Sequence, residues 1–155
     1  MKARLPALVA MVPAVLLSAA VAEAQARFVV NRSMEGVAIG MSAEQVGDHL
    51  GDPARREAGP DFETWRYRRP PMEVALKPDV VTLHTRSILV RGPAGVGIRT
   101  PERRLKTVLG RRLRCETTAG QRLCVVGSFE TGMRSTVFEM IRGRVKTITI
   151  SESVE

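Results

Sequence analysis

The chain has few of the residue types that most often carry enzyme chemistry. Its 155 residues include two cysteines, two histidines, one tryptophan and one tyrosine, and aromatic residues make up 4% of the composition. Neither His49 nor His84 has both a carboxylate and a nucleophile at a local spacing typical of histidine-dependent catalysis. The sequence also lacks an H-x-x-x-H pattern for a metal. We therefore expect a non-enzymatic protein with no catalytic residues, no metal site and no cofactor.

Long apolar runs are missing beyond the N-terminus. The one such run, Leu5 to Val21, follows Lys2 and Arg4 and precedes the small-x-small sequence Ala24-Gln25-Ala26. This order is typical of a secretory signal peptide, and the run is short of the ~20 residues that span a bilayer. We expect residues 1–26 to be cleaved, leaving a mature chain that begins at Arg27. That chain has no transmembrane segment and is secreted or held in the periplasm or cell envelope.

Acidic residues are outnumbered by basic ones. The whole chain has a net charge of +8, residues 27–155 keep +7, and +6 of this lies in residues 95–155. A basic surface suits an acidic protein, an anionic envelope polymer or anionic lipid headgroups, although solvated arginines alone give the same composition. Export argues against nucleic acid as a partner.

One segment of the sequence occurs twice. Residues 36–51 recur as residues 95–110, with five identical positions that are all glycine or apolar. A framework that keeps glycine and apolar residues while polar positions change indicates a duplicated structural unit. In the first copy Ser42 and Gln45 form a capping box for a helix that Gly51 ends. In the second copy Thr100 is the expected N-cap and Pro101 the first helical residue.

Strands are expected after each helix. The alternation of apolar and polar residues predicts them at residues 62–68, 72–77, 80–90, 113–118, 121–126, 134–141 and 145–150. The strand at 80–90 is expected either to be continuous or to be kinked or divided near Ser87. We therefore predict an α+β fold of two tandem repeats, each a short helical segment followed by three or four antiparallel strands. The first αβ repeat is residues 27–94 and the second is residues 95–155, joined by an ordinary linker at 91–95.

The two cysteines are expected to form a disulfide, because the chain carries an export signal. A two-residue turn at Ala119-Gly120 would place Cys115 opposite Cys124 as a non-hydrogen-bonded pair, in which side chains come closest. The spacing differs from the C-x-x-C of redox proteins, so we expect a structural bond in a hairpin.

The candidate binding residues are aromatics and arginines. Trp65 and Tyr67 lie on one face of a predicted strand, and they either pack beneath the first helix or stand exposed as anchors for a partner. Arginines near them and in the second half would supply carboxylate or phosphate contacts. These arginines are Arg66, Arg68, Arg112, Arg114 and Arg122.

The segment from Gly40 to Val46, with Leu50-Gly51-Asp52-Pro53 and Trp65-Arg66-Tyr67, resembles the small envelope domain of the SmpA/OmlA outer-membrane assembly lipoproteins. Two such units in an exported chain with a disulfide resemble the β-lactamase inhibitory protein family. The resemblance implies the tandem αβ fold, but no inhibitory or assembly residue is carried over. This chain lacks the cysteine that the lipoproteins lipidate, and it has cysteines only in its second half.

We therefore expect an exported binding module that recognises a protein or an anionic envelope component. One alternative is an inhibitor of an extracellular enzyme such as a β-lactamase. Another is a small secreted enzyme whose site assembles only in space, which would show His49 or His84 beside an acidic side chain in a concave pocket.

Overall fold

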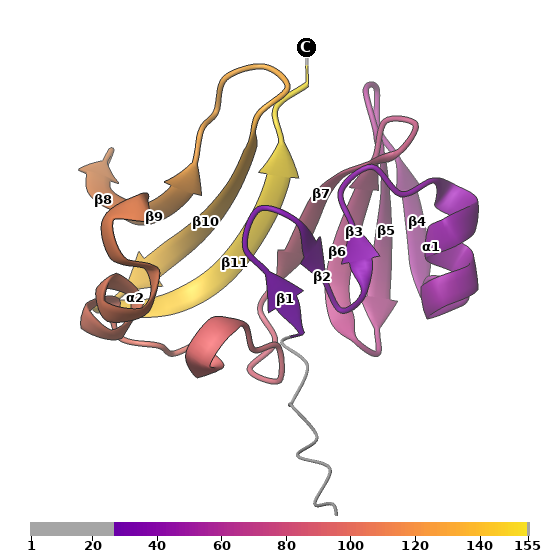
Figure 1. Cartoon of the computed structure of the whole chain (residues 1–155). Coiled ribbons are helices and arrows are strands. Elements are labelled where there is room, and N and C mark those ends of the chain that lie inside the picture. The colour runs from indigo at the N-terminus through magenta and orange to yellow at the C-terminus, as the bar shows by residue number, and fades with distance from the viewer. Residues whose placement is uncertain (1–26, 155) are drawn as a thin grey trace, which may run out of the picture.

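The structure is a computed structural model that describes residues 27–154, so the expected signal peptide lies outside the described residues. It is an α+β fold with one eight-stranded antiparallel sheet, one three-stranded sheet and two α-helices, as Figure 1 shows. The strands of the large sheet are β4 (Arg55–Ala58), β5 (Glu63–Arg68), β6 (Pro71–Leu76), β7 (Val80–Thr85), β8 (Leu113–Thr118), β9 (Gln121–Gly127), β10 (Arg134–Ile141) and β11 (Arg144–Glu152). None of the helices in residues 27–154 is long and apolar enough to cross a membrane.

The large sheet is continuous across both halves of the chain. Its strand order is β4-β5-β6-β7-β11-β10-β9-β8, so each half forms a meander and the last strand of each half lies at the centre. The two halves join where β7 pairs with β11, with Leu83 opposite Ile150 and His84 opposite Thr149. The strand order is thus symmetric about the pairing of β7 with β11.

One face of the sheet carries the hydrophobic core. In β5 the residues alternate, so that Trp65 and Tyr67 are buried while Arg66 and Arg68 are exposed. β6 alternates in the same way, and the buried residues of the sheet form one cluster with side chains of both helices and of the N-terminal strands. Fully buried members include Val74, Leu83, Phe138 and Ile148. The opposite face of the sheet has no helix over it within the described residues, and we call it the open face.

The first helix, α1 (Ala43–Leu50), forms as the sequence predicts. Ser42 accepts a hydrogen bond from the backbone N–H of Gln45, and the Gln45 side chain accepts one from the N–H of Ser42. Gly51 ends the helix with a φ of 76°. Val46 is fully buried and Leu50 packs against the core, which fixes this short helix on the sheet.

The second helix, α2 (Glu102–Leu109), begins one residue later than the sequence predicts. Pro101, not Thr100, is its N-cap, and no side chain caps it. The hydroxyl of Thr100 instead accepts a hydrogen bond from the N–H of Gly97 at 2.9 Å, because Thr100 is buried in the turn before the helix. Leu105 and Leu109 supply the buried face as expected.

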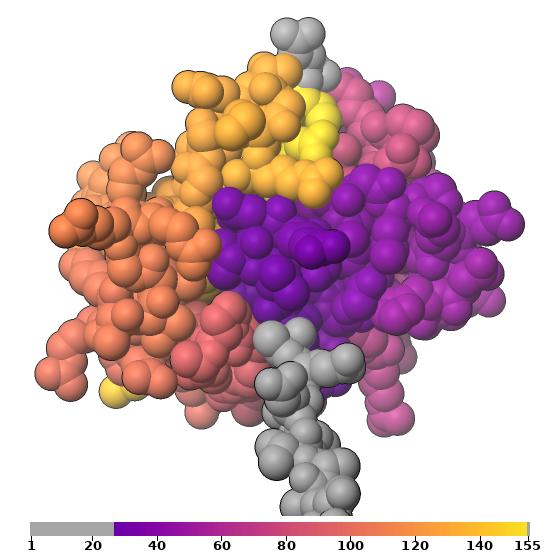
Figure 2. Space-filling model, in the orientation of Figure 1, coloured from indigo at the N-terminus to yellow at the C-terminus, as the bar shows by residue number. Residues whose placement is uncertain are grey.

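Three short N-terminal strands cover the core between the two helices (Figure 1). They are β1 (Phe28–Val29), β2 (Ser33–Met34) and β3 (Val37–Ala38), which pair in that order. In the space-filling view they fill the centre of this side of the molecule, in contact with both halves (Figure 2). Phe28, Met34 and Val37 are fully buried. No apolar alternation in the sequence predicts a strand here, although these residues close the core.

Two further segments differ from the prediction. The strand expected over residues 80–90 ends at Thr85, whose hydroxyl donates a hydrogen bond to the carbonyl of Pro71. The segment expected to be an ordinary linker contains a 3₁₀ turn, Pro93–Gly95. Gly92 there is buried so tightly that a Cβ would lie 2.3 Å from the ring of Phe28. This connection is therefore part of the packed structure.

Candidate functional site

A row of side chains crosses the open face at right angles to the strands. The register places Arg66 opposite both Arg55 and Glu73, Glu73 opposite His84, and His84 opposite Thr149. Side chains that are opposite in a sheet point to the same face, so these five residues form one line across five neighbouring strands. The row therefore begins with two cations and continues through a carboxylate, an imidazole and a hydroxyl.

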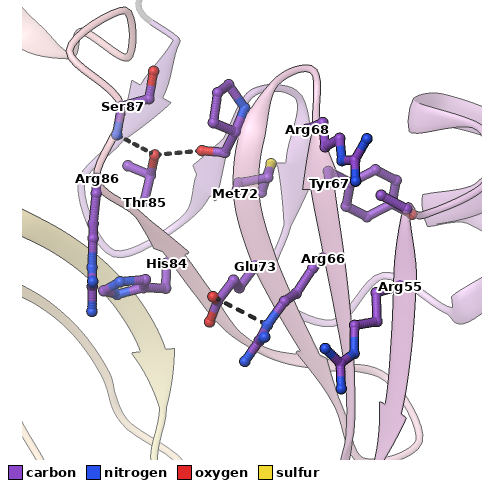
Figure 3. A pocket seen from close by; sticks show the side chains of 12 residues that line it. Arg55, Arg66, Tyr67, Arg68, Met72, Glu73, His84, Thr85, Arg86 and Ser87 are labelled. Carbon is purple, nitrogen blue, oxygen red and sulfur yellow. Dashed lines mark hydrogen bonds and ion pairs between the residues drawn. The ribbon is translucent and has the colours of Figure 1, made fainter.

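A groove of about 770 Å³ lies over this part of the open face, and Figure 3 shows its lining residues. We call it the arginine groove, because four arginines and a single glutamate line it. The arginines are Arg55, Arg66, Arg68 and Arg86. Since arginine is a permanent cation whose planar fork matches carboxylate and phosphate oxygens, the groove is suited to an anionic ligand.

The four arginines differ in how strongly they are held. Arg55 pairs with Glu57 at 2.7 Å, and Arg66 pairs with both Glu57 and Glu73 at 3.3 Å. Arg68 and Arg86 have no ion pair or hydrogen bond to any side chain within residues 27–154. Both side chains are exposed. The groove thus contains two guanidinium groups that are free to bind an external anion.

His84 lies in the same groove and is held by its neighbours. Its Nδ1 lies 2.9 Å from the hydroxyl of Thr149, and the side chain is half-buried. Burial lowers the pKa of His84, an effect that Arg86 reinforces while Glu73 and Glu139 oppose it. The imidazole is therefore biased toward its neutral form. His49, by contrast, lies on the other side of the sheet, where Nε2 is 3.0 Å from the carbonyl of Glu35.

Trp65 and Tyr67 are not exposed anchors. Their side chains are 4% and 6% exposed, and they pack in the core beneath α1 as the alternative interpretation held. The Tyr67 hydroxyl donates a hydrogen bond to the carbonyl of Gly51, and Arg56 stacks on the Trp65 ring at 4.3 Å from its centroid. The strand alternation put both aromatics on one face, but that face is the buried one.

The arginines of the second half that were predicted to bind a partner do not lie in the arginine groove. Arg112 and Arg114 line a separate hollow with Arg111 and Asn31, near the start of β8. Arg114 also donates a hydrogen bond to the carbonyl of Gly127. Of the predicted cations, only Arg66 and Arg68 lie in the arginine groove.

Arg122 is occupied within the fold. Its guanidinium binds Glu102 with both Nε and Nη2, at 3.2 and 2.7 Å, and Lys106 binds the same carboxylate at 2.7 Å. These bonds lower the pKa of Glu102 to about 2. Arg122 therefore links α2 to β9, and it is not available to a partner without breaking this contact.

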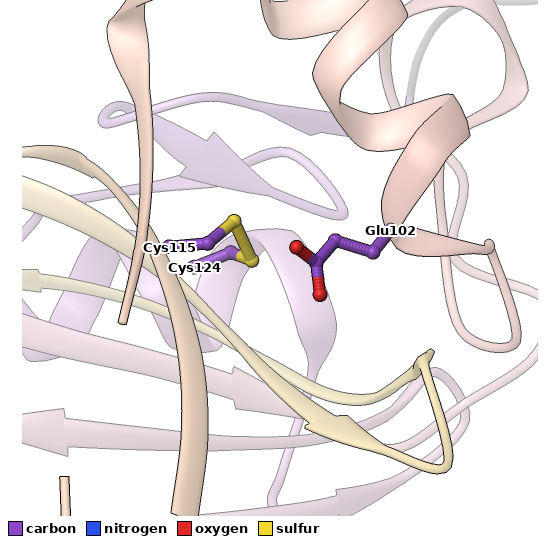
Figure 4. Close-up of side chains that lie close together, drawn as sticks. All are labelled: Glu102, Cys115 and Cys124. Carbon is purple, nitrogen blue, oxygen red and sulfur yellow. A yellow bond between two sulfur atoms is a disulfide. The ribbon is translucent and has the colours of Figure 1, made fainter. Parts of the chain in front are cut away.

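Cys115 and Cys124 form the expected disulfide, with opposite positions in the β8–β9 hairpin and a 2.01 Å bond between the sulfurs. The carboxylate of Glu102 lies beside them, so that three ligand-type atoms fall within 4.8 Å of one another (Figure 4). A thiolate is the form of cysteine that binds metals, and neither sulfur is a thiolate in the disulfide. This cluster therefore offers a metal only one carboxylate, which Arg122 and Lys106 already hold.

Two of the four arginines in the groove, Arg55 and Arg86, are not among the candidate binding residues predicted from the sequence. Arg55 lies in β4, a strand of mainly polar residues that carries no apolar alternation. Arg86 follows the last residue of β7, at a position where the sequence predicted a longer strand. The position of Arg86 two residues after His84 is the one signal that could have placed it on the same face.

Comparison with known proteins gives no family assignment but does identify similar folds. No family model and no curated protein matches the chain. A solved extracellular protein from Bacillus anthracis that contains an SCP domain matches with a TM-score of 0.53 and 13% identity. A cysteine-rich secretory protein from Staphylococcus aureus matches with a TM-score of 0.50 and 9% identity. Each match covers 74% of this chain and 44% of the solved chain.

These matches correct the family resemblance drawn from the sequence. The resemblance to the β-lactamase inhibitory proteins and to the SmpA/OmlA lipoproteins rested on one helix-and-turn segment, and the comparisons do not support it. Such a segment is dictated by helix capping and by the turn that follows, and it recurs in unrelated folds. The chain instead resembles, over less than half of their length, extracellular proteins that include one with an SCP domain.

Proposed function

We propose that this chain is an exported, non-enzymatic binding module that captures an anionic protein or envelope component in the arginine groove. The observation that carries the proposal is the pair Arg68 and Arg86, two exposed cations with no anionic partner within residues 27–154. Arg55 and Arg66, already fixed by Glu57 and Glu73, border the same groove. A carboxylate or phosphate placed between these groups would gain charge-assisted hydrogen bonds.

Export and processing after Ala26 are part of this proposal. They are supported by the signal-like N-terminus and by the extracellular nature of the solved proteins that share the fold. The partners are then the carboxylate-rich proteins, anionic polymers or anionic lipids of the compartment that the mature chain enters.

We also infer that residues 27–94 and 95–155 are two repeats of one unit. Each has a helix followed by four strands, and equivalent residues share unusual backbone angles. Glu35 and Ala94 have φ values of 51° and 48°, while Gly40 and its counterpart Arg99 have 88° and 71°. Val37 and Val96 are both fully buried. The residues that line the arginine groove all belong to the first unit.

The test is a binding measurement with matched variants. Immobilised protein (residues 27–155) is titrated with polyglutamate, polyphosphate and anionic lipid vesicles over a salt series. The double variant Arg68→Gln/Arg86→Gln is compared with Arg32→Gln/Arg103→Gln, which removes the same charge from exposed residues outside the groove. Loss of one charge-assisted contact weakens binding about tenfold or more. Equal weakening by both double variants would reduce the interaction to net charge and contradict the proposal.

A small secreted enzyme is a second candidate, because His84 is not isolated. It lies opposite Glu73 on one side and is hydrogen-bonded to Thr149 on the other. This order of hydroxyl, imidazole and carboxylate is the kind that activates a nucleophile when the geometry is correct. Hydrolysis of an ester or peptide that is lost in His84→Gln, but kept in Arg68→Gln/Arg86→Gln, would favour this candidate over the binding module.

A further inference from the structure

A second cavity lies at the turn between β5 and β6, shares Pro71 and Ser87 with the lining of the arginine groove, and contains a buried carboxylate whose partners are incomplete. The cavity has a volume of about 300 Å³ and is lined by Arg27, Glu35, Arg69, Pro70, Pro71, Ser87, Leu89 and Val90. The Glu35 side chain is only 7% exposed. Its Oε2 pairs with Arg27 Nε at 3.0 Å, whereas its Oε1 is buried without any hydrogen-bond partner. A buried carboxylate oxygen without a donor is costly, so something is expected to satisfy it.

Glu35 is held firmly in this position by the backbone. It forms, with Gly36, the turn between β2 and β3, and both residues have positive φ values, 51° and 83°. The backbone carbonyl of Glu35 lies 3.0 Å from His49 Nε2, and its backbone N–H donates to the carbonyl of Arg27. The backbone of Glu35 is therefore fixed, and the ion pair with Arg27 holds its carboxylate in the cavity.

Arg27 is fixed in the same place. Its guanidinium binds Glu35 and also donates to the carbonyl of Leu89, while the next residue, Phe28, donates its N–H to the carbonyl of Arg91. The side chain of Arg27 thus contacts the Glu35 carboxylate, and its carbonyl contacts the Glu35 backbone, so the α-nitrogen of Arg27 belongs to a residue that already binds Glu35 at two points. While Ala26 is attached this nitrogen is an uncharged amide.

We propose that cleavage after Ala26 creates the missing partner: the α-ammonium of Arg27 binds the Oε1 atom of Glu35. Hydrolysis of the Ala26–Arg27 peptide bond by water leaves a carboxylate on Ala26 and an ammonium with three donors on Arg27. That ammonium completes the coordination of Glu35, and the new N-terminus becomes a structural element of the mature protein. The inference rests on the proposed processing site, but it is independent of the arginine groove.

Chemistry supports an ammonium as the occupant. Burial raises the pKa of Glu35, which shows that one guanidinium does not fully offset the desolvation of the carboxylate. The charged side chains that line this cavity are Arg27, Glu35 and Arg69. Arg69 is exposed and is the competing cation, so the test must separate it from the N-terminus.

The decisive experiment is a double-mutant cycle between the N-terminus and Glu35. Chains beginning at Arg27 and at Gln25, which have the same net charge, are each prepared with Glu35 and with Glu35→Gln. We expect the chain that begins at Arg27 to have a thermal midpoint about 3–6 °C higher than the longer chain at pH 7, and no such advantage in the Glu35→Gln pair. The control is Glu44→Gln, which removes an exposed carboxylate from α1 and should preserve the difference.

A second readout needs no substitution. A bound α-ammonium has a pKa above its ordinary value of about 7.7–8.0, and NMR titration of the protein with labelled Arg27 measures it. Because the folded-state pKa is raised, the added stability is present below about pH 8 and disappears as pH rises through the folded value. An unshifted α-amino pKa would overturn the proposal. So would a difference in thermal midpoint between the two chain starts that is the same with Glu35 and with Glu35→Gln.

The remaining outcomes are also decisive. Arg69→Gln is the competing test. If it lowers the thermal midpoint only when Glu35 is present, while the chains that begin at Gln25 and at Arg27 are equally stable, then Arg69 is the partner of Glu35 and the proposal is wrong. N-terminal sequencing of the exported protein checks the processing site itself. Cleavage elsewhere would refute the assignment of Arg27 while leaving binding by the arginine groove intact.

Discussion

The arginines of this protein perform two different tasks, and their partners determine which. Arg122 and Arg66 contact carboxylates on neighbouring elements and hold strands or a helix in place. Arg68 and Arg86 contact no carboxylate within the described residues and border the groove. Total charge does not distinguish these groups, so the basic composition alone does not locate the binding surface.

Glu102 makes the fold sensitive to acid. Its pKa is lowered to about 2, first by its hydrogen bond to Arg122 and then by that to Lys106, from an ordinary value of 4.5. Stability from this carboxylate is therefore present above about pH 4.5 and is lost as pH falls toward 2. Glu102→Gln should lower the urea midpoint at pH 7 and flatten its decline between pH 5 and about pH 2. An unchanged decline would assign the acid sensitivity to other carboxylates.

Trp65 is a core residue and should behave as one. Trp65→Ala should lower the free energy of unfolding by about 3–5 kcal/mol, because it removes a large buried side chain. Phe62, three residues earlier, is 49% exposed, and Phe62→Ala should change stability by about 0.5 kcal/mol or less. Urea titration followed by far-UV circular dichroism measures both. Equal losses would place the ring of Phe62 in the core as well.

The sequence could show that Trp65 and Arg66 point to opposite faces, since a strand has a period of two. It could not show which face is buried. That choice depends on where α1 and the N-terminal strands pack, and these contacts join residues far apart in the chain. The same limit applies to the arginine groove, whose lining residues come from four strands and from loop residues next to β4 and β7.

At the scale of elements, the sequence predicts an element correctly where a full capping or turn motif is present. The capping box predicts the start of α1, and the Ala119-Gly120 turn predicts the register that brings Cys115 opposite Cys124. The missed elements have no such signals. β4 is mainly polar and is held by pairing with β5, while β1, β2 and β3 have two residues each. Their conformations depend on tertiary contacts.

The turn between β2 and β3 requires glycine for two separate reasons. Gly36 has a φ of 83°, and a Cβ there would lie 2.0 Å from His49 Nε2. The counterpart Gly95 has a φ of 75° with no atom within 4 Å of its Cβ position. Gly36→Ala should therefore lower the free energy of unfolding more than Gly95→Ala does. Gly95→Ala introduces only backbone strain, which is about 1 kcal/mol.

Differential scanning calorimetry of the two glycine variants measures this difference. Adding His49→Ala to Gly36→Ala should recover the part of the loss that comes from the steric clash. If the two alanine variants lose the same stability, the close approach of His49 makes no contribution.

At the scale of the molecule, the two halves should unfold together. They share one continuous sheet and one core cluster, so neither half has a core of its own. Trp65 fluorescence reports on the first half, whereas far-UV circular dichroism reports on both. We expect the two urea transitions to coincide. A fluorescence transition that occurs at a lower urea concentration would instead show that the first half unfolds separately.

The central pairing of β7 with β11 has a consequence for synthesis. β7 is complete at Thr85, whereas its partner β11 follows only after α2 and three further strands. Until β11 emerges, one side of β7 has open hydrogen-bonding groups, the kind of edge on which chains aggregate. A prematurely terminated chain would keep this edge permanently. We therefore expect the nascent chain to be prone to aggregation through β7 until β11 has been made.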